Sequence, residues 1–164
     1  MATETQELVR AAMQLEQDGR QFYLGAAAKA ESDLVRGTFE GLADDELRHM
    51  AYIREISAGE DTLQTVNQRV YDRLRGIFVD VPDVVRQEAA VDVEALNSAI
   101  EIEEKSRVAY EKWGQETQDT KVRELCELLT GAELFHRQLL ENVVSYLESP
   151  SDFFLREERW FVEG

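Results

Sequence analysis

The sequence contains little cysteine, little proline and no long apolar run, and each scarcity narrows the possible classes of protein. Cys126 is the only cysteine among 164 residues, which excludes an intramolecular disulfide and a cysteine-based iron or zinc site. Proline occurs only at Pro82 and Pro150, so long stretches are free of this helix breaker. No stretch approaches about 18 consecutive apolar residues, so we expect neither a membrane span nor a signal peptide. A cytoplasmic location is the corresponding expectation.

Basic residues are scarce as well. There are 18 Lys and Arg residues against 34 Asp and Glu residues, and the formal net charge is −16. This imbalance argues against nucleic acid and anionic membranes as partners, because their phosphates would be repelled. It is compatible with attracting metal cations, although an acidic surface that keeps a protein in solution is the more common explanation. The apolar fraction of 43% excludes a disordered chain, and the length fits one domain with its own core.

Histidine is scarce as well, and both copies follow a glutamate by three positions. His49 ends the segment "ELRH" and His136 ends the segment "ELFH", and the two lie 136 − 49 = 87 residues apart. At the same offset, "AMQLEQDGRQFY" at 12–23 aligns without a gap with "AIEIEEKSRVAY" at 99–110. Two copies of so long a unit predict the internal duplication of one supersecondary element, packed on itself, and not a solenoid.

The apolar residues recur at helical spacing and predict an all-α chain with four long helices. The predicted helices span about residues 3–31, 34–59, 93–114 and 119–147. Asp33 is the predicted N-cap of the second helix, and the third is expected to begin after Asp92. Residues 61–91 are too many for a hairpin loop, so we expect a crossover whose first half is a short amphipathic helix. Two short connections and one long one predict a four-helix bundle of two hairpins over residues 1–148.

Residues 149–164 form a separate tail in this prediction. The tail carries four aromatic side chains that are too apolar to remain in water: Phe153, Phe154, Trp160 and Phe161. We therefore expect the tail to pack on the bundle or on a partner subunit.

Six ionisable side chains fall on the predicted core faces of the helices. They are one glutamate from each helix and the two histidines: Glu16, Glu46, His49, Glu103, Glu133 and His136. Buried ionisable groups are costly unless they are paired or bound to metal. Four carboxylates balance two divalent cations, which predicts a dinuclear site in which Glu46 and Glu133 bridge the ions. Nitrogen and oxygen ligands without thiolate suit iron or manganese.

A single Glu-x-x-His segment would be weak support for a metal site, since helix surfaces often pair such residues for solubility. Two such segments, at the same offset from two further core-facing glutamates and using every histidine, favour metal binding. A glutamate from each of two helices combined with Glu-x-x-His from the other two is the pattern of ferritin-like carboxylate proteins.

These residues resemble the rubrerythrin-like branch of the ferritin-like diiron proteins. The resemblance covers about residues 4–147 and is carried by "LEQDGRQFY", "FEGLADDELRH", "IEEKSRVAY" and "LLTGAELFH". It implies a ferritin-like bundle in which the six side chains ligate two iron ions, with manganese or zinc as substitutes. It also implies reaction with hydrogen peroxide or dioxygen and oxidation of iron(II). Tyr23 and Tyr110 would hydrogen-bond ligand carboxylates, and ordinary core tyrosines are the alternative.

The sequence departs from typical rubrerythrins at two points. Ile100 stands where they carry a further glutamate ligand, and it matches Met13 in the first repeat. One cysteine cannot build their four-cysteine electron-donor domain, so electrons are expected from a separate protein. We expect a homo-oligomer, with a dimer favoured. Two other functions stay open: iron storage with ferroxidase action in a cage, and a metal-stabilised or metal-free bundle that binds another protein.

Gly19 and Ser106 occupy equivalent repeat positions, one helical turn after Glu16 and Glu103. A glycine within a helix costs about 1 kcal/mol relative to alanine, so its presence needs a reason. Open space beside the metals and close helix packing are the two explanations. Cys126 is expected to be a small core hydrophobe.

Overall fold

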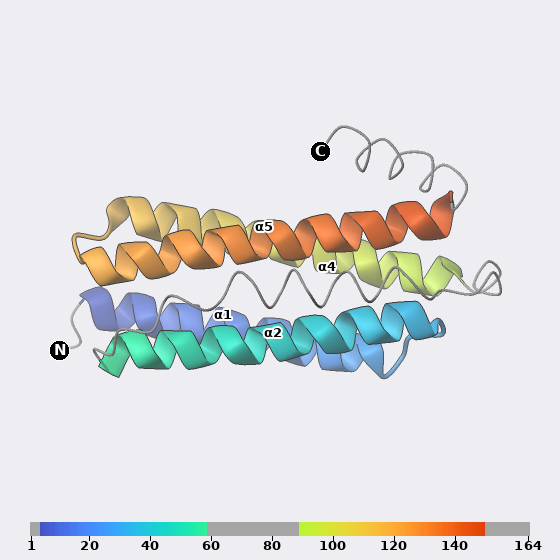
Figure 1. Cartoon of the computed structure of the whole chain (residues 1–164), viewed down its shortest axis with the longest axis horizontal. Helices are drawn as coiled ribbons and strands as arrows, with labels where there is room; N and C mark the ends of the chain where they lie inside the picture. Colours follow the sequence, from blue (N-terminus) through green and yellow to red (C-terminus); the bar gives the residue numbers. More distant parts are fainter. Residues whose placement is uncertain (1–3, 59–88, 150–164) are drawn as a thin grey trace, which may run out of the picture.

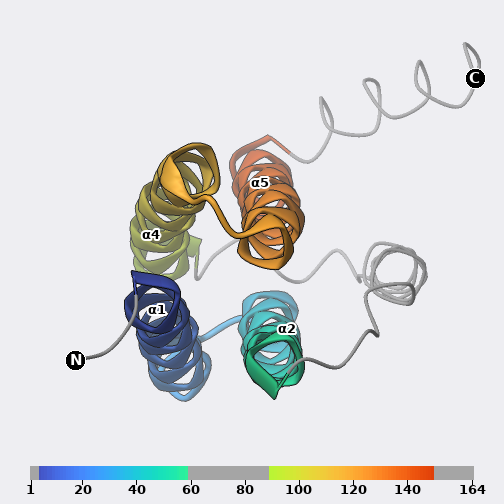
Figure 2. The ribbon, with the colours of Figure 1, turned by 90° about the vertical axis from the view of Figure 1, so that its left-hand side faces the viewer.

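Four α-helices contain nearly all of the residues that the computed structural model describes, which are 4–58 and 89–149. The helices are α1 (Glu4–Ala27), α2 (Asp33–Ala58), α4 (Ala89–Glu116) and α5 (Thr120–Glu148). Seen along the bundle they occupy four corners, with α1 beside α4 and α2 beside α5 (Figure 2). Because the described residues contain no strand, the prediction of an all-α four-helix bundle is confirmed. None of these four helices is long and apolar enough to cross a bilayer.

The helices form two hairpins, α1 with α2 and α4 with α5, and most of the tertiary packing lies within them. The end of α2 and the start of α4 lie at opposite ends of the bundle (Figure 1). The predicted amphipathic helix of the crossover and the aromatic tail lie outside the described residues. Residues 89–91, which the sequence assigned to the crossover, belong instead to α4.

The start of α2 differs from the prediction by one residue. Asp33 is the first residue of the helix, so it is not the N-cap. The hydroxyl oxygen of Ser32 accepts a hydrogen bond from the Val35 amide at 3.5 Å, and the Ser32 carbonyl accepts one from the Arg36 amide at 2.9 Å. Ser32 therefore caps α2, because its side chain satisfies an amide that has no partner within the helix.

Asp92 was also misplaced, because it lies inside the first turn of α4 and not before it. Its carboxylate accepts hydrogen bonds from the amides of Glu31 and Ser32 at 3.1 and 2.8 Å. These amides belong to the connection between α1 and α2, because α1 ends at Ala27 and not near residue 31. Asp92 thus ties the second half of the chain to the connection of the first hairpin.

Hydrogen bonds at the two hairpin connections repeat with the 87-residue offset. Asp119 is the N-cap of α5 and corresponds in the repeat to Ser32 at the start of α2. Arg36 and Arg123, which also correspond, each donate at 2.9 Å to a carbonyl of the preceding connection. The two hairpins therefore begin their second helices in the same way, as an internal duplication requires.

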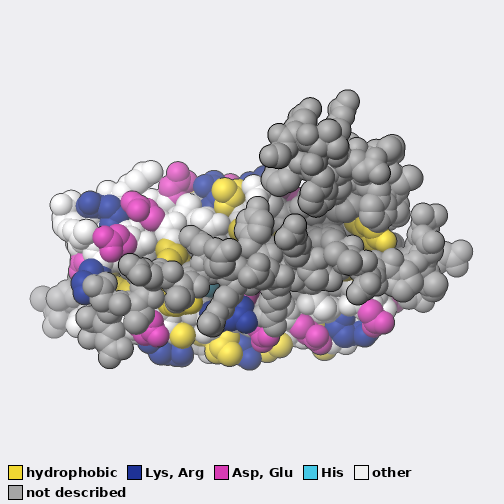
Figure 3. All heavy atoms as spheres, viewed as in Figure 1, with side chains coloured by type: hydrophobic (Ala, Val, Ile, Leu, Met, Phe, Trp, Pro, Cys, Tyr) yellow, Lys and Arg dark blue, Asp and Glu magenta, His cyan; other side chains and the backbone are white. Residues whose placement is uncertain are grey.

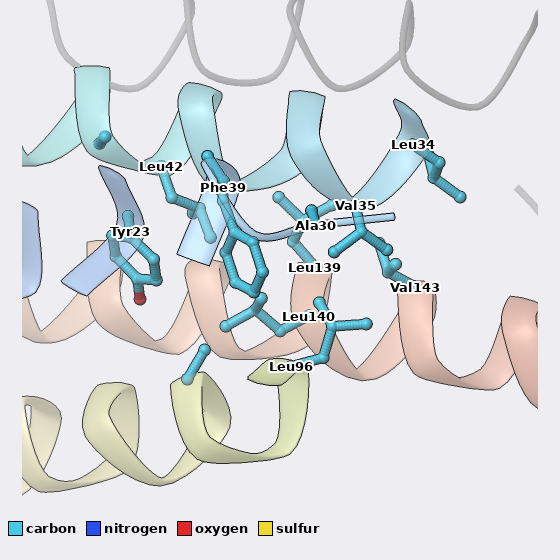
Figure 4. Close-up of a cluster of buried hydrophobic side chains, with 13 residues drawn as sticks. Tyr23, Ala30, Leu34, Val35, Phe39, Leu42, Leu96, Leu139, Leu140 and Val143 are labelled. Carbon is cyan, nitrogen blue, oxygen red and sulfur yellow. The ribbon is translucent and has the colours of Figure 1, made fainter. Parts of the chain in front are cut away.

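Two apolar clusters fill the interior on either side of the bundle's middle. The larger consists of Tyr23, Ala27, Ala30, Leu34, Val35, Phe39, Leu42, Ala43, Leu96, Ala99, Leu139, Leu140 and Val143. The smaller consists of Ala12, Ile53, Tyr110, Leu125 and Leu129. Figure 4 shows side chains from the larger cluster, with Tyr23 at one edge. Each buried large apolar side chain contributes about 1.5–3 kcal/mol. In every helix the predicted ligands lie between the residues of these clusters.

Acidic and basic side chains are interspersed on the visible face of the bundle (Figure 3). The second hairpin carries a network of ion pairs on its outer surface. Arg107 pairs with Glu104 and Glu111 at 2.9 and 3.0 Å, and Arg137 pairs with Glu104 and Glu141 at 2.9 and 2.8 Å. Solvent screens such partly exposed pairs, so they add little to stability.

Candidate metal centre

All six predicted ligands lie together inside the bundle, and none has more than 3% of its surface exposed. Their nitrogen and oxygen atoms form two groups, in each of which the atoms lie within 4.8 Å of one another. The first group contains Glu16, Glu46, His49 and Glu133. The second group contains Glu46, Glu103, Glu133 and His136. The two groups share Glu46 and Glu133, the carboxylates expected to bridge two ions, and ligation by all six stays a prediction.

The duplication brings the two imidazoles face to face at the middle of the site. The rings of His49 and His136 are stacked, with centroids 5.3 Å apart and an interplanar angle of 20°. His49 Nδ1 lies 2.8 Å from Glu16 and 3.2 Å from Glu46. His136 Nδ1 lies 3.4 Å from Glu46 and 3.5 Å from Glu103. Each Nδ1 atom therefore faces the shared carboxylate of Glu46 and one glutamate that belongs to its own group alone.

Two buried atoms of the second group lack a hydrogen-bond partner, and they are Nδ1 of His136 and Oε2 of Glu103. An unsatisfied buried polar atom costs about 1–3 kcal/mol, so native proteins have few of them. The carboxylate oxygen, and the nitrogen once the ring has lost its extra proton, carry lone pairs suited to a cation, and both residues belong to one group of close ligand atoms. The donor set therefore fits a divalent metal ion.

Tyr23 and Tyr110 are fully buried, and both donate to predicted ligands. The Tyr23 hydroxyl donates to Glu103 and the Tyr110 hydroxyl donates to Glu16, so each tyrosine reaches a glutamate of the other hairpin. Burial and the charge of Glu16 raise the pKa of Tyr110, which keeps its hydroxyl a neutral donor. Both tyrosines also pack in the apolar clusters, so they combine the two alternatives that the sequence left open.

Without metal the site takes up protons on its carboxylates. Burial and the charge of Glu46 raise the pKa of Glu16 to about 8. Burial and the charge of Glu103 raise the pKa of Glu133 well above its usual range. Burial opposes ionisation of Glu46 too, but hydrogen bonds with Glu16 and His136 outweigh it and lower the Glu46 pKa. Without metal, Glu16 and Glu133 therefore hold a proton more tightly than Glu46 does.

The histidines take up protons as well. Burial favours the neutral imidazole, but the charge of Glu16 outweighs it and raises the pKa of His49 to about 9. The charge of Glu103 outweighs burial in the same way and raises the pKa of His136 well above its usual range. Both rings must lose a proton before Nδ1 can bind a cation, so metal binding is coupled to proton release.

Asp45 is a member of this site that the sequence did not reveal. Its Oδ2 atom lies 3.6 Å from Nε2 of His136, and its Oδ1 atom accepts from Arg48. Its side chain is only 11% exposed. Burial opposes ionisation, but the contact with His136 outweighs it and lowers the Asp45 pKa. In the sequence, only its position next to Glu46 could have pointed to Asp45. The second repeat argued against a role for this position, because it has Ala132 there.

Gly19 is buried against one of the shared carboxylates. A Cβ atom at this position would lie 3.6 Å from Cδ of Glu46, which is an ordinary contact distance. An alanine would therefore fit, so close helix packing does not by itself require glycine. A longer side chain would press on the Glu46 carboxylate.

Cys126 and Ile100, which the sequence analysis also considered, lie in apolar surroundings. Cys126 is buried, as expected, and a Cβ atom on Gly114 would lie only 3.1 Å from it. Burial raises the pKa of the Cys126 thiol to about 11, so it stays protonated and unreactive. Ile100 is partly buried and packs against the larger apolar cluster.

No protein-family model, curated protein or solved structure matches this chain.

Proposed function

We propose that this chain is a diiron oxidoreductase, similar to rubrerythrins, that reacts with hydrogen peroxide or dioxygen and oxidises iron(II). The observation that carries the proposal is the pair of buried Glu and His groups that share Glu46 and Glu133. With both imidazoles neutral, the four carboxylates carry four negative charges, and two divalent cations balance them. Burying those charges uncompensated would be strongly unfavourable.

Iron is the proposed metal because the donor set is imidazole and carboxylate without thiolate, a set that manganese shares. When bound, two iron(II) ions supply one electron each, so that one hydrogen peroxide and two protons become two water molecules. Repeated turnover needs electrons from outside, and we assign this role to a separate donor protein. Zinc would fill the same positions but supplies no redox chemistry.

The protein's own contribution is to hold the ligands in place and exclude water. Tyr23 and Tyr110 fix the terminal carboxylates Glu103 and Glu16 from the opposite hairpin. The apolar clusters lie on both sides of the ligands along the bundle. Because bulk water is excluded, interactions between charges inside the site are stronger than at the surface.

The ferritin-like connectivity is also part of the proposal. It is supported by the end of α2 and the start of α4, which lie at opposite ends of the bundle with residues 59–88 between them in the sequence (Figure 1). We further propose a homodimer. Size-exclusion chromatography tests this assembly and separates it from the much larger cage of a storage protein.

Anaerobic loading of the full chain with iron(II), followed by elemental analysis, tests the proposal directly. We expect two iron ions per chain, and a rapid absorbance increase when the loaded protein is mixed with peroxide or dioxygen. Repeated peroxide reduction should require an added electron donor. A plateau at one ion or at none would overturn the dinuclear site. Two bound ions without oxidation would instead favour the metal-stabilised binding module.

A further inference from the structure

The internal duplication is broken at two positions beside the second ligand glutamate of the first hairpin, Glu46. In the first half of the chain these positions hold Asp45 and Arg48, and the offset of 87 places Ala132 and Phe135 at the equivalent positions. All six predicted ligands are identical between the two repeats. The difference therefore lies beside the predicted ligands and not among them. The two halves of the site therefore have the same ligands but different surroundings.

Asp45 is placed to act on only one of the two imidazoles. Its Oδ2 atom lies 3.6 Å from Nε2 of His136 on the facing helix, an ion-pair distance. Arg48, one helical turn later, pairs with the other carboxylate oxygen and holds Asp45 from the solvent side. The equivalent residue in the second half, Ala132, has no carboxylate to offer His49.

The two nitrogens of His136 consequently face different groups. Nε2 faces Asp45, whereas Nδ1 faces Glu46 and Glu103 at 3.4 and 3.5 Å and has no hydrogen-bond partner. A carboxylate on the far nitrogen of a ligating histidine fixes the tautomer and makes the near nitrogen a stronger donor to metal. His49 differs, because its Nδ1 atom lies 2.8 Å from Glu16.

We propose that Asp45 is a positioning residue that makes the two halves of the centre unequal, so that the first metal ion binds in the group of Glu103 and His136. The second ion then binds, more weakly, in the group of Glu16 and His49. This inference rests on the proposed dinuclear site and adds an order of loading to it. Side chains that hydrogen-bond a metal ligand typically change metal affinity by about 10–100-fold. We therefore expect the first ion to bind about 10–100 times more tightly than the second.

Titration of the metal-free full chain with Mn(II) tests the order of loading, with calorimetry for the affinities and electron paramagnetic resonance for the ions. We expect two separate steps, with an isolated-ion signal after one equivalent and a spin-coupled signal only after the second. Asp45→Ala should weaken the first step by about 10–100-fold, so that the coupled signal already appears at one equivalent. Asp45→Asn, which keeps a hydrogen-bond acceptor, should restore part of the separation.

Two further variants make the test specific. Glu40→Ala removes an exposed negative charge from the same helix and should leave both steps unchanged. Ala132→Asp adds a carboxylate at the position equivalent to Asp45 and should strengthen the second step. Melting of each metal-free variant shows whether it is folded.

The outcomes separate this inference from the proposed function. Two equal steps in the unmodified chain, or equal weakening by Asp45→Ala and Glu40→Ala, would overturn the inference and leave the dinuclear site standing. Strengthening of the second step by Ala132→Asp supports the inference even if the Asp45 variants do not fold. No binding of Mn(II) or iron(II) would overturn both.

Discussion

The two hairpins carry the same predicted ligands and differ in several of the side chains around them. Each supplies two carboxylates, one imidazole and one tyrosine that reaches across to the other hairpin. The second hairpin adds an outer network of ion pairs around Glu104, whereas the repeat places Gln17 at the equivalent position of the first. The first hairpin adds Asp45, which acts on the histidine of the second. Divergence between the copies has therefore changed the surface and the outer contacts and has left the buried donor set intact.

The largest expected effect comes from removing a shared carboxylate, because each hairpin supplies one. Glu133→Ala should slow the fast oxidation of bound iron(II) by on the order of 100-fold or more, since loss even of an outer partner costs about 10–100-fold. Glu46→Ala should do the same if the hairpins contribute equally. Stopped-flow mixing with peroxide or dioxygen measures the rates.

Glu127→Ala is the matched control for this experiment, because Glu127 is an exposed glutamate on the same helix as Glu133. Its oxidation rate should equal that of the unmodified chain. Equal rates for the Glu127 and Glu133 variants would show that the repeat identifies the wrong ligands.

Removing metal should destabilise the whole bundle, because the shared carboxylates join both hairpins. A ligand at 100 times its dissociation constant stabilises the folded state by about 2.7 kcal/mol. For a chain of this size that corresponds to a fall in melting temperature of about 5–10 °C on chelation near neutral pH. Calorimetry on loaded and chelated protein checks this. Equal melting temperatures would mean that the buried glutamates need no cation.

The stability of the metal-free protein should fall as pH rises. The pKa of Glu16 is raised from 4.5 to about 8 and that of His49 from 6.5 to about 9, so the folded state binds more protons than the unfolded state within those ranges. Each group stabilises the folded state fully at pH values below its pKa in the unfolded state. The contribution of Glu16 is lost as pH rises through about 8, and that of His49 as pH rises through about 9. Each extra bound proton gives a slope of at most about 1.4 kcal/mol per pH unit.

Glu16→Gln sharpens this pH prediction, because glutamine resembles the protonated carboxyl and does not titrate. Urea unfolding of the metal-free variant between pH 6 and 9.5 should show a shallower decline than the unmodified chain. If the unfolding free energy of the variant declined with pH as steeply as that of the unmodified chain, titration of Glu16 would not be a cause of the decline. The gap between loaded and metal-free protein should widen with pH in the unmodified chain, because protons compete with metal for the same atoms.

The smallest effect should come from the surface network that only the second hairpin possesses. Arg137→Gln breaks the pairs with Glu104 and Glu141, and we expect a change in melting temperature of about 2 °C or less. The change should shrink further in high salt, because exposed ion pairs are screened. A larger change, or one that is insensitive to salt, would show that the network is needed to hold α4 against α5.

Local periodicity made much of the fold and the donor set predictable from the sequence. The helical spacing of apolar residues identified the four helices and their inner faces. The 87-residue offset singled out one glutamate on the inner face of each helix. The helical spacing relates residues a few positions apart, and the offset appears when the chain is compared with itself, so neither pattern needs knowledge of the tertiary structure. The burial of Glu16, Glu46, Glu103 and Glu133 follows from that spacing.

Contacts between distant residues were decided only by the tertiary structure. The resemblance implied that Tyr23 hydrogen-bonds a ligand carboxylate, but only the tertiary structure shows that this carboxylate belongs to Glu103, which lies 80 residues away in the sequence. It also concealed Asp45, whose partner His136 lies on another hairpin and whose repeat equivalent is alanine. Asp92 was read as a helix start, but it accepts hydrogen bonds from a connection about 60 residues away. Periodicity fixes which side of a helix faces inward, whereas the packing of hairpins fixes which atoms then meet.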